Sequence, residues 1–172
     1  MTGVPEFADG TERPLDPGFV LLQRLRGLIA TAVIALGLLI ALAITTPLAG
    51  WSKPTLVLAL LAGWSALVVG LGAWTWFWPQ LEYRYIAWRL GEAGLEIRRG
   101  VVWREVVSVP RTRVQHTDVT HGPIERSFGL ATLVVFTAGT THASVTLGGL
   151  TRDVGEQIRD YLIAGGSGRD DV

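Results

Sequence analysis

Two neighbouring stretches without an ionisable residue decide the fold of the first half of the chain. Residues 27–52 read GLIATAVIALGLLIALAITTPLAGWS, residues 54–81 read PTLVLALLAGWSALVVGLGAWTWFWPQL, and Lys53 stands between them. A helix that crosses the hydrocarbon core of a bilayer needs about 20 mostly apolar residues, and it must satisfy its own backbone hydrogen bonds there. The sequence therefore predicts a two-helix transmembrane hairpin over residues 27–78, with spans at about 28–48 and 55–78.

The hairpin divides the chain of 172 residues into unequal parts. Residues 1–26 are the expected N-terminal tail, and residues 1–20 mix proline, glycine and acidic residues without a period, which predicts disorder or loose attachment. Residues 79–165 are expected to form a β-rich domain, and residues 166–172 a flexible C-terminal tail.

Basic residues near the span ends predict the orientation of the hairpin. Arg24 and Arg26 precede the first span, Arg84 and Arg89 follow the second, and the link offers Lys53. Because cytoplasmic flanks carry the excess of arginine and lysine, we expect a two-span protein of the cell membrane with both termini in the cytoplasm.

Small residues in the second span permit another helix to approach closely. They are Gly63, Ser65, Gly70 and Gly72. Two interpretations stay open: these residues pack the hairpin against itself, or they serve a homo-oligomer.

Beyond Pro79 the chain alternates apolar and polar residues over short runs separated by turn residues, which predicts strands. The expected strands are 83–90, 95–98, 101–109, 114–120, 132–137 and 143–147. In the third of these, Val101, Trp103, Val107 and Val109 would share one face. A helix then runs to about Ala164, with an apolar stripe at Val154, Ile158, Tyr161 and Leu162. This order predicts a bent sheet closed by a C-terminal helix.

Spaced residues within these strands resemble the bacterial PH domain of YdbS-like membrane proteins. The segments that carry the resemblance are Gly91-x-x-Gly94-Leu95-x-Ile97-x-x-Gly100-Val101, Val109-Pro110-x-x-Arg113-Val114-Gln115, the run from Gly122 to Thr132 (GPIERSFGLAT), Thr137-Ala138-Gly139, and Gly149-Leu150. The resemblance implies a PH-like domain, a bent antiparallel sheet or barrel closed by the C-terminal helix. Some relatives carry several copies of the span-plus-domain unit, so the single copy seen here is expected to work beside a multi-copy relative or another membrane protein.

The signature residues are expected to serve the fold. They are Gly94, Gly100, Pro110, Gly122, Pro123, Glu125, Gly129 and Gly139. Gly122-Pro123 is typical of a turn, in which glycine allows angles that a Cβ would forbid. In the helical turn that follows, Ile124 and Phe128 would be buried, whereas Glu125 and Arg126 would project and pair locally or take a ligand.

Catalytic, metal and cofactor sites are not expected. His116 and Asp118 would share a strand face but His121 would not, which is too few ligands for zinc. The serines lie in no nucleophile motif, and no glycine-rich phosphate loop precedes a helix. A formal net charge of zero argues against nucleic acid as a partner.

The expected function is therefore a membrane-anchored PH-like binding or scaffolding module that recognises a protein partner on the cytoplasmic face of a bacterial membrane. Open sheet edges could accept a strand of that partner. The candidate binding residues are Arg111, Arg113 and Arg126, and the segment 111–126 would line the site. The alternative is a stress-responsive membrane factor in which these arginines contact anionic lipids; an enzyme is the third and weakest hypothesis.

Overall fold

The structure is a computed structural model that describes residues 5–48, 54–138 and 144–166. The chain divides into two compact units. One unit is the hairpin, Gln23–Gln80, and the other is a domain that combines Met1–Leu22 with Leu81–Val172. The predicted link at 49–53, the turn residue Gly139 and the predicted tail after residue 166 lie outside the described residues.

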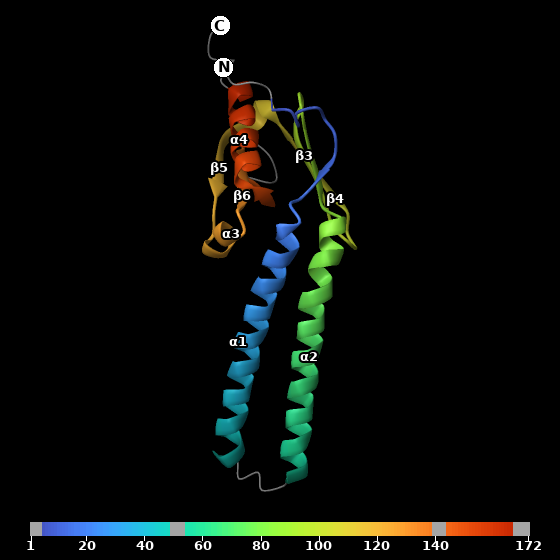
Figure 1. The fold of residues 1–172 in the computed structure, drawn as a ribbon, viewed down its shortest axis with the longest axis vertical. Coiled ribbons are helices and arrows are strands. Elements are labelled where there is room, and N and C mark those ends of the chain that lie inside the picture. The colour runs from blue at the N-terminus through green and yellow to red at the C-terminus, as the bar shows by residue number, and fades with distance from the viewer. Residues whose placement is uncertain (1–4, 49–53, 139–143, 167–172) are drawn as a thin grey trace. The chain divides into compact units, whose positions relative to one another are not determined.

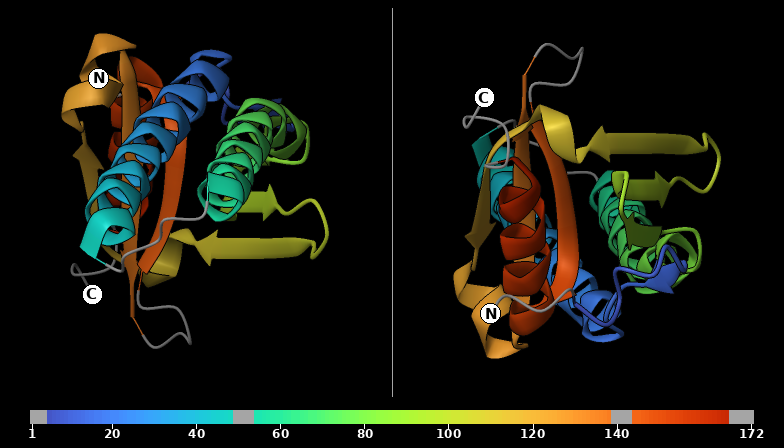
Figure 2. Two further views of the ribbon diagram at one scale, coloured as in Figure 1. Left: turned by 90° about the horizontal axis from the view of Figure 1, so that it is seen from below. Right: turned by 90° about the horizontal axis from the view of Figure 1, so that it is seen from above.

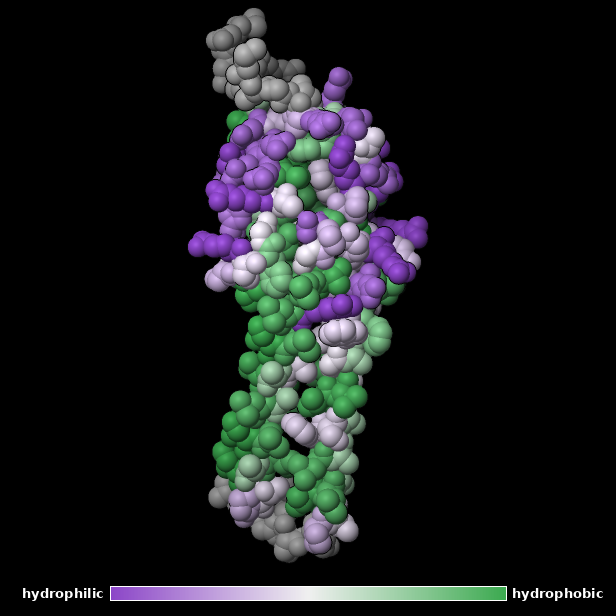
Figure 3. Space-filling model, in the orientation of Figure 1, coloured by the Kyte–Doolittle hydropathy of each residue, from purple (hydrophilic) through white to green (hydrophobic). Residues whose placement is uncertain are grey.

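The hairpin consists of α1 (Gly18–Leu48) and α2 (Pro54–Arg84) (Figure 1). Both helices are long and apolar enough to cross a membrane. Figure 3 shows hydrophobic residues over most of their visible surface. The predicted transmembrane hairpin is confirmed, with two differences in its bounds. The first helix begins at Gly18 rather than near residue 28, and α2 continues to Arg84, through the start of the strand predicted from Tyr83.

The two helices of the hairpin lie close together at Gly27. A Cβ added there would lie 2.8 Å from the Thr75 Cγ2 atom. A Cβ at Gly63, Gly70 or Gly72 would meet nothing within 4 Å. The interpretation that these glycines pack the hairpin against itself is therefore wrong, and their use in a homo-oligomer stays a prediction.

Seven strands of the domain form two antiparallel sheets (Figure 2). The first sheet has the order β1 (Arg13–Pro14), β2 (Ala87–Gly91), β3 (Gly94–Arg99) and β4 (Glu105–Pro110). The second has the order β5 (Val114–Thr120), β6 (Leu130–Thr137) and β7 (Ser144–Thr151). The helical segments are η1 (Arg111–Arg113), α3 (Pro123–Ser127) and α4 (Arg152–Gly166).

The two sheets and α4 share one hydrophobic core. Trp88 and Leu90 contribute from the first sheet, Leu133 from the second, and Ile158 and Leu162 from α4. The last four of these side chains are fully buried. Ile158 and Leu162 belong to the apolar stripe that the sequence predicts, and β6 is the central strand of its sheet. The PH-like architecture is thus confirmed as two antiparallel sheets with a C-terminal helix; the described strands do not close into one barrel.

The segment before the first span belongs to this domain. Leu15, Phe19 and Leu22 are only 3%, 8% and 1% exposed. The Tyr83 hydroxyl donates to the Leu15 carbonyl oxygen at 3.1 Å, and Asp16 N–H donates to the Gly149 carbonyl at 2.9 Å. The prediction of a loosely attached tail is wrong for residues 5–20. Three apolar side chains in a stretch rich in proline and glycine form no detectable period, yet each occupies the core.

The β3–β4 hairpin also differs from the prediction. Residues 101–104 form the turn, and the strand begins only at Glu105. Gly100 has φ +113°, and a Cβ there would overlap the Trp103 carbonyl. Because the chain reverses at this glycine, Trp103 does not share an inner face with Val109; it is 88% exposed, whereas Val109 is 3% exposed.

Candidate functional site

The turn between β5 and β6 is built by α3. Gly122 precedes the helix with φ −66° and ψ 160°, an extended conformation that other residues adopt, so the expected need for glycine angles at this position is wrong. Pro123 occupies the first helical turn, where its missing N–H costs nothing. The helix ends at Ser127, and Gly129 follows in the left-handed region with φ +66°.

Glu125 holds this turn together from the inside. Its side chain is buried, with 8% of the residue exposed. One carboxylate oxygen accepts from Gly122 N–H at 2.8 Å, and the other accepts from the Thr132 hydroxyl at 3.2 Å. Glu125 therefore does not project, contrary to expectation, while Ile124 and Phe128 are only half-buried. The carboxylate satisfies a helix N-terminal donor and fastens the turn to β6.

Arg126 points the other way and lines a hollow that we call the basic hollow. This hollow of about 400 Å³ is formed by His121, Arg126, Gly129, Leu130 and Arg152. The turn after β5 supplies His121, α3 supplies Arg126, and the N-terminus of α4 supplies Arg152. Arg126 is exposed. The β5–β6 connection and the distant start of α4 thus place cationic or protonatable side chains around one concavity.

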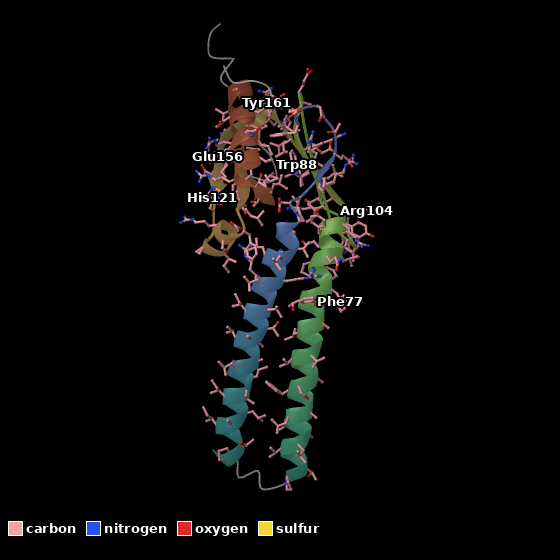
Figure 4. All side chains as sticks on the ribbon, in the orientation of Figure 1. Phe77, Trp88, Arg104, His121, Glu156 and Tyr161 are labelled. Carbon is pink, nitrogen blue, oxygen red and sulfur yellow. The ribbon has the colours of Figure 1, made fainter. Side chains whose placement is uncertain are left out.

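The charges of the basic hollow are partly balanced by two acids, Glu156 and Asp153. Arg152 donates to Glu156 at 2.8 Å, and this bond raises the pKa of Arg152 and lowers that of Glu156. Figure 4 labels His121 and Glu156 on neighbouring parts of the domain. The His121 Nδ1 atom lies 3.3 Å from the Leu130 carbonyl oxygen. The charged residues that line the hollow itself are Arg126 and Arg152, so the hollow suits a carboxylate or a phosphate.

Arg111 is engaged by α4. Its guanidinium donates to the Tyr161 carbonyl oxygen at 2.6 Å and lies 4.0 Å from the centroid of the Tyr161 ring. Both contacts fasten Arg111 to the C-terminal half of α4. Arg113 is exposed at the end of η1.

The structure therefore does not bring the three predicted arginines together. The seven residues of β5 separate Arg113 from the turn that carries Arg126, a distance of roughly 20 Å along an extended strand. In the predicted segment 111–126, Arg111 at one end is thus bonded to α4, whereas Arg126 at the other end lines the basic hollow.

A second hollow lies beside the β2–β3 turn. It has a volume of about 360 Å³ and is lined by Gly10, the turn residues 91–94, and the end of β4 at Val109 and Pro110, together with the strand residues Arg89, Leu95, Glu96 and Ser108. Two of its charged lining groups are paired, because Arg89 contacts Glu96, which Arg98 also contacts; the third, Glu92, lies exposed in the turn. The hydrogen bond from Arg89 is the main cause that lowers the pKa of Glu96. This hollow offers less unbalanced charge to a ligand than the basic hollow does.

The histidine and aspartate of β5 form no metal centre with their described neighbours. His116 is exposed and stacks on Phe136, with ring centroids 4.1 Å apart. Within residues 5–48, 54–138 and 144–166, no three His, Asp or Glu side chains converge.

Comparison with known proteins places this architecture in a family. The family model of the bacterial PH domain matches residues 19–165. The chain belongs to the bacterial PH domain family. A similar protein is the UPF0699 transmembrane protein YdbS of Bacillus subtilis (strain 168), which is 29% identical over 84 residues. That alignment covers 49% of this chain and 51% of the relative, so the match spans about half of the relative's length. No solved structure matches the chain.

Two members of the basic hollow escaped the sequence analysis of this bacterial PH domain. Arg152 follows β7 directly and reads as a residue of a helix start, while His121 lies within the predicted segment 111–126 but was considered individually only as a metal ligand. Neither shares a motif with Arg126. The signal that unites them is the pairing of β6 with β7, in which Leu130 lies opposite Thr151. This pairing brings the residues next to both strands to one place.

Proposed function

We propose that this bacterial PH domain protein is a membrane-anchored binding module that recognises an acidic segment of a partner protein in the basic hollow. The observation that supports it is the convergence of Arg126, Arg152 and His121 on one concavity from three separate segments. Of the described residues lining the hollow, all charged ones are cationic. Charge-assisted hydrogen bonds from arginine to a carboxylate are strong and directional.

The proposed role is binding rather than catalysis. The residues that line the basic hollow provide positive charge and hydrogen-bond donors, but none of those described there is a hydroxyl or thiol nucleophile. The His121 Nδ1 atom lies beside the Leu130 carbonyl oxygen. A site of this kind orients and holds an anion without activating it.

We propose further that the domain faces the cytoplasm, with both termini on that side. Arg24 and Arg26 before the first span and Arg84 after the second flank the same side of the hairpin and support this orientation. The chain contains no cysteine, so single cysteines introduced at exposed positions report the side directly. We expect a cysteine at Thr112 to react with a membrane-impermeant maleimide only after cells are opened; labelling of intact cells would place the domain outside.

The binding proposal is tested with the full chain, because Leu15, Phe19 and Leu22 complete the domain core and a fragment limited to residues 79–166 would lack them. The protein is crosslinked in its native membranes, purified in mild detergent, and its crosslinked peptides are sequenced. We expect an acidic peptide of a membrane protein to crosslink next to Arg126, and the crosslink to be lost in Arg126→Glu and Arg152→Glu.

Arg113→Glu is the matched control, because Arg113 is also exposed but lies at the other end of β5. It should leave the crosslink intact. Reversing the charge of the partner's acidic residues should restore binding to Arg126→Glu. A partner recovered equally with all three variants, or no partner at all, would refute recognition through the basic hollow.

A further inference from the structure

The tip of the β3–β4 hairpin exposes large apolar side chains to a degree unusual for this domain. Val102 is 75% exposed and Trp103 is 88% exposed. Val106, at the start of β4, adds a third side chain at 58%. Apart from these, the largest exposed fraction among the large apolar residues that the structure describes beyond α2 is 45%, at Ile163. A tryptophan with nearly its whole surface in water calls for an apolar contact.

Strand register places this tip at one end of the first sheet. Ala87, the first residue of β2, pairs with Arg98, and Arg99 at the end of β3 pairs with Glu105. The turn that follows Arg99 therefore lies at the end of the sheet where β2 begins. The opposite end carries the β2–β3 turn, where Gly91 pairs with Gly94.

The same end of the sheet is where the chain arrives from the membrane. Tyr85 and Ile86 alone separate Arg84, the last residue of α2, from Ala87. Three residue steps span at most about 11 Å. Because Ala87 pairs with Arg98, the short link from α2 and the strand register together keep the tip of the β3–β4 hairpin within a short distance of the end of a transmembrane helix.

Charge around the tip suits a membrane surface. Arg98 and Arg99 precede the turn and Arg104 ends it, and Figure 4 labels Arg104 at the rim of the domain. Arg98 contacts Glu12 and Glu96, and Arg99 pairs with Glu105 at 2.9 Å. Arg104 is exposed directly beside Trp103.

We propose that Val102 and Trp103 insert into the interface of the bilayer that holds the protein's own hairpin, with Arg104 at the level of the lipid headgroups. Tryptophan favours the boundary between headgroups and acyl chains, where its ring is apolar and its N–H stays hydrated. A neighbouring arginine adds attraction to anionic lipid. The contact would fix the rotation of the domain over the membrane and thus the direction in which it presents its other surfaces.

A lipid surface fits this tip better than a protein does. A stable protein interface buries about 800 Å² on each partner. Two apolar side chains on a narrow turn, with a third on the adjoining strand, fall well short of that area, and neither of the two hollows described above includes them. A bilayer needs no matching surface, and the tether from α2 supplies it at high effective concentration.

The test measures the depth of the tip in the full-length protein. A spin label is attached at Val102→Cys, with Trp103 retained, and the protein is placed in nanodiscs of phosphatidylcholine with phosphatidylglycerol. Because the chain has no cysteine of its own, labelling is specific. Collisions with oxygen, which concentrates in the bilayer, are compared with collisions with a water-soluble nickel chelate. Ala93→Cys is the matched control, an exposed turn position at the other end of the same sheet.

We expect the label at 102 to collide mainly with oxygen and the label at 93 mainly with nickel, a several-fold difference in the ratio. Adding Trp103→Ser to the labelled Val102→Cys protein should shift its ratio toward that of position 93. Equal ratios at the two positions would show the tip in water and overturn the proposal. Protection of position 102 from both reagents would show a protein occupant instead, and would overturn it as well. Neither result bears on the basic hollow.

Discussion

The two ends of the segment from Arg111 to Arg126 share a family signature but differ in their surroundings. At the first end, Gly94 leaves no room beside Val109 and Pro110, and Arg111 is bonded to α4. At the second end, Gly129 has nothing within 4 Å of an added Cβ, and Arg126 lines a hollow. A dense run of signature residues therefore contains both packing positions and surface positions. The local environment, not the motif, separates them.

The largest expected effect is at the packed end, in Gly94→Ala. Gly94 has φ +137°, and its Cβ would overlap the Val109 carbonyl oxygen. We expect the domain to lose at least about 2 kcal/mol of unfolding free energy, from backbone strain and displacement of β4. Pulse proteolysis of the full chain across a urea series measures the loss.

Gly129→Ala is the control for that variant at the open end. Its φ of +66° also disfavours a side chain, but the space is free. We expect a loss of about 1 kcal/mol, the cost of a left-handed residue alone. Equal losses in the two variants would mean that backbone conformation, not space, decides, and the contrast between the two ends would fail.

The next effect is expected in Arg111→Met, compared with Arg113→Met. Methionine keeps most of the stem of Arg111 but loses the charged hydrogen bond to Tyr161 and the contact with its ring. We expect a loss of about 2–3 kcal/mol. Arg113 is exposed, so its replacement should change stability by less than about 0.5 kcal/mol. If both substitutions are neutral, Arg111 is as available for a ligand as Arg113.

Glu125→Ala examines the one buried group of the open end. It removes the acceptor for Gly122 N–H and the partner of the Thr132 hydroxyl. We expect a loss of about 1–2 kcal/mol, similar to the loss of a helix N-cap. Glu92→Ala, in the exposed β2–β3 turn, is the control and should be near neutral. A neutral result for Glu125→Ala would instead show that Glu125, like the exposed Arg126, does not stabilise the fold.

The structure was predicted well wherever a sequence pattern extends over many residues or repeats with a strict period. Two uninterrupted apolar stretches gave the hairpin, and a stripe with helical spacing at Ile158 and Leu162 gave α4. The patterns failed where a few residues act through distant contacts. Leu15 and Phe19 enter the core from a stretch without period, and Trp103 leaves the sheet because Gly100 reverses the chain.

The candidate site was less predictable than the fold for a related reason. Arg111, Arg113 and Arg126 look similar in sequence, since each lies in a segment that carries the family resemblance. Their roles depend on α4: the carbonyl of Tyr161 takes Arg111, and the start of the same helix supplies Arg152 beside Arg126. The local sequence around residues 111 and 126 does not indicate where α4 lies, because that helix begins 26 residues after Arg126.

The smallest effect is expected for two carboxylates whose pKa is lowered: Glu96, beside the Arg111 end of the segment, and Glu156, beside the Arg126 end. Arg89 and then Arg98 lower the pKa of Glu96, and Arg152 lowers that of Glu156. A lowered folded-state pKa gives stability that is present above the unfolded value near 4.5 and is lost as pH falls through the folded value. The Glu96 side chain is 16% exposed and that of Glu156 is 36% exposed, so water screens the second pair more.

We expect Glu96→Gln to remove at most about 1 kcal/mol at pH 7 and to flatten the loss of stability below pH 4.5. Glu156→Gln should flatten it less, because its ion pair is more open to solvent. Pulse proteolysis between pH 3.5 and 7 measures both slopes; a steeper change for Glu156→Gln would show that the open end holds its charges more tightly than its exposure indicates.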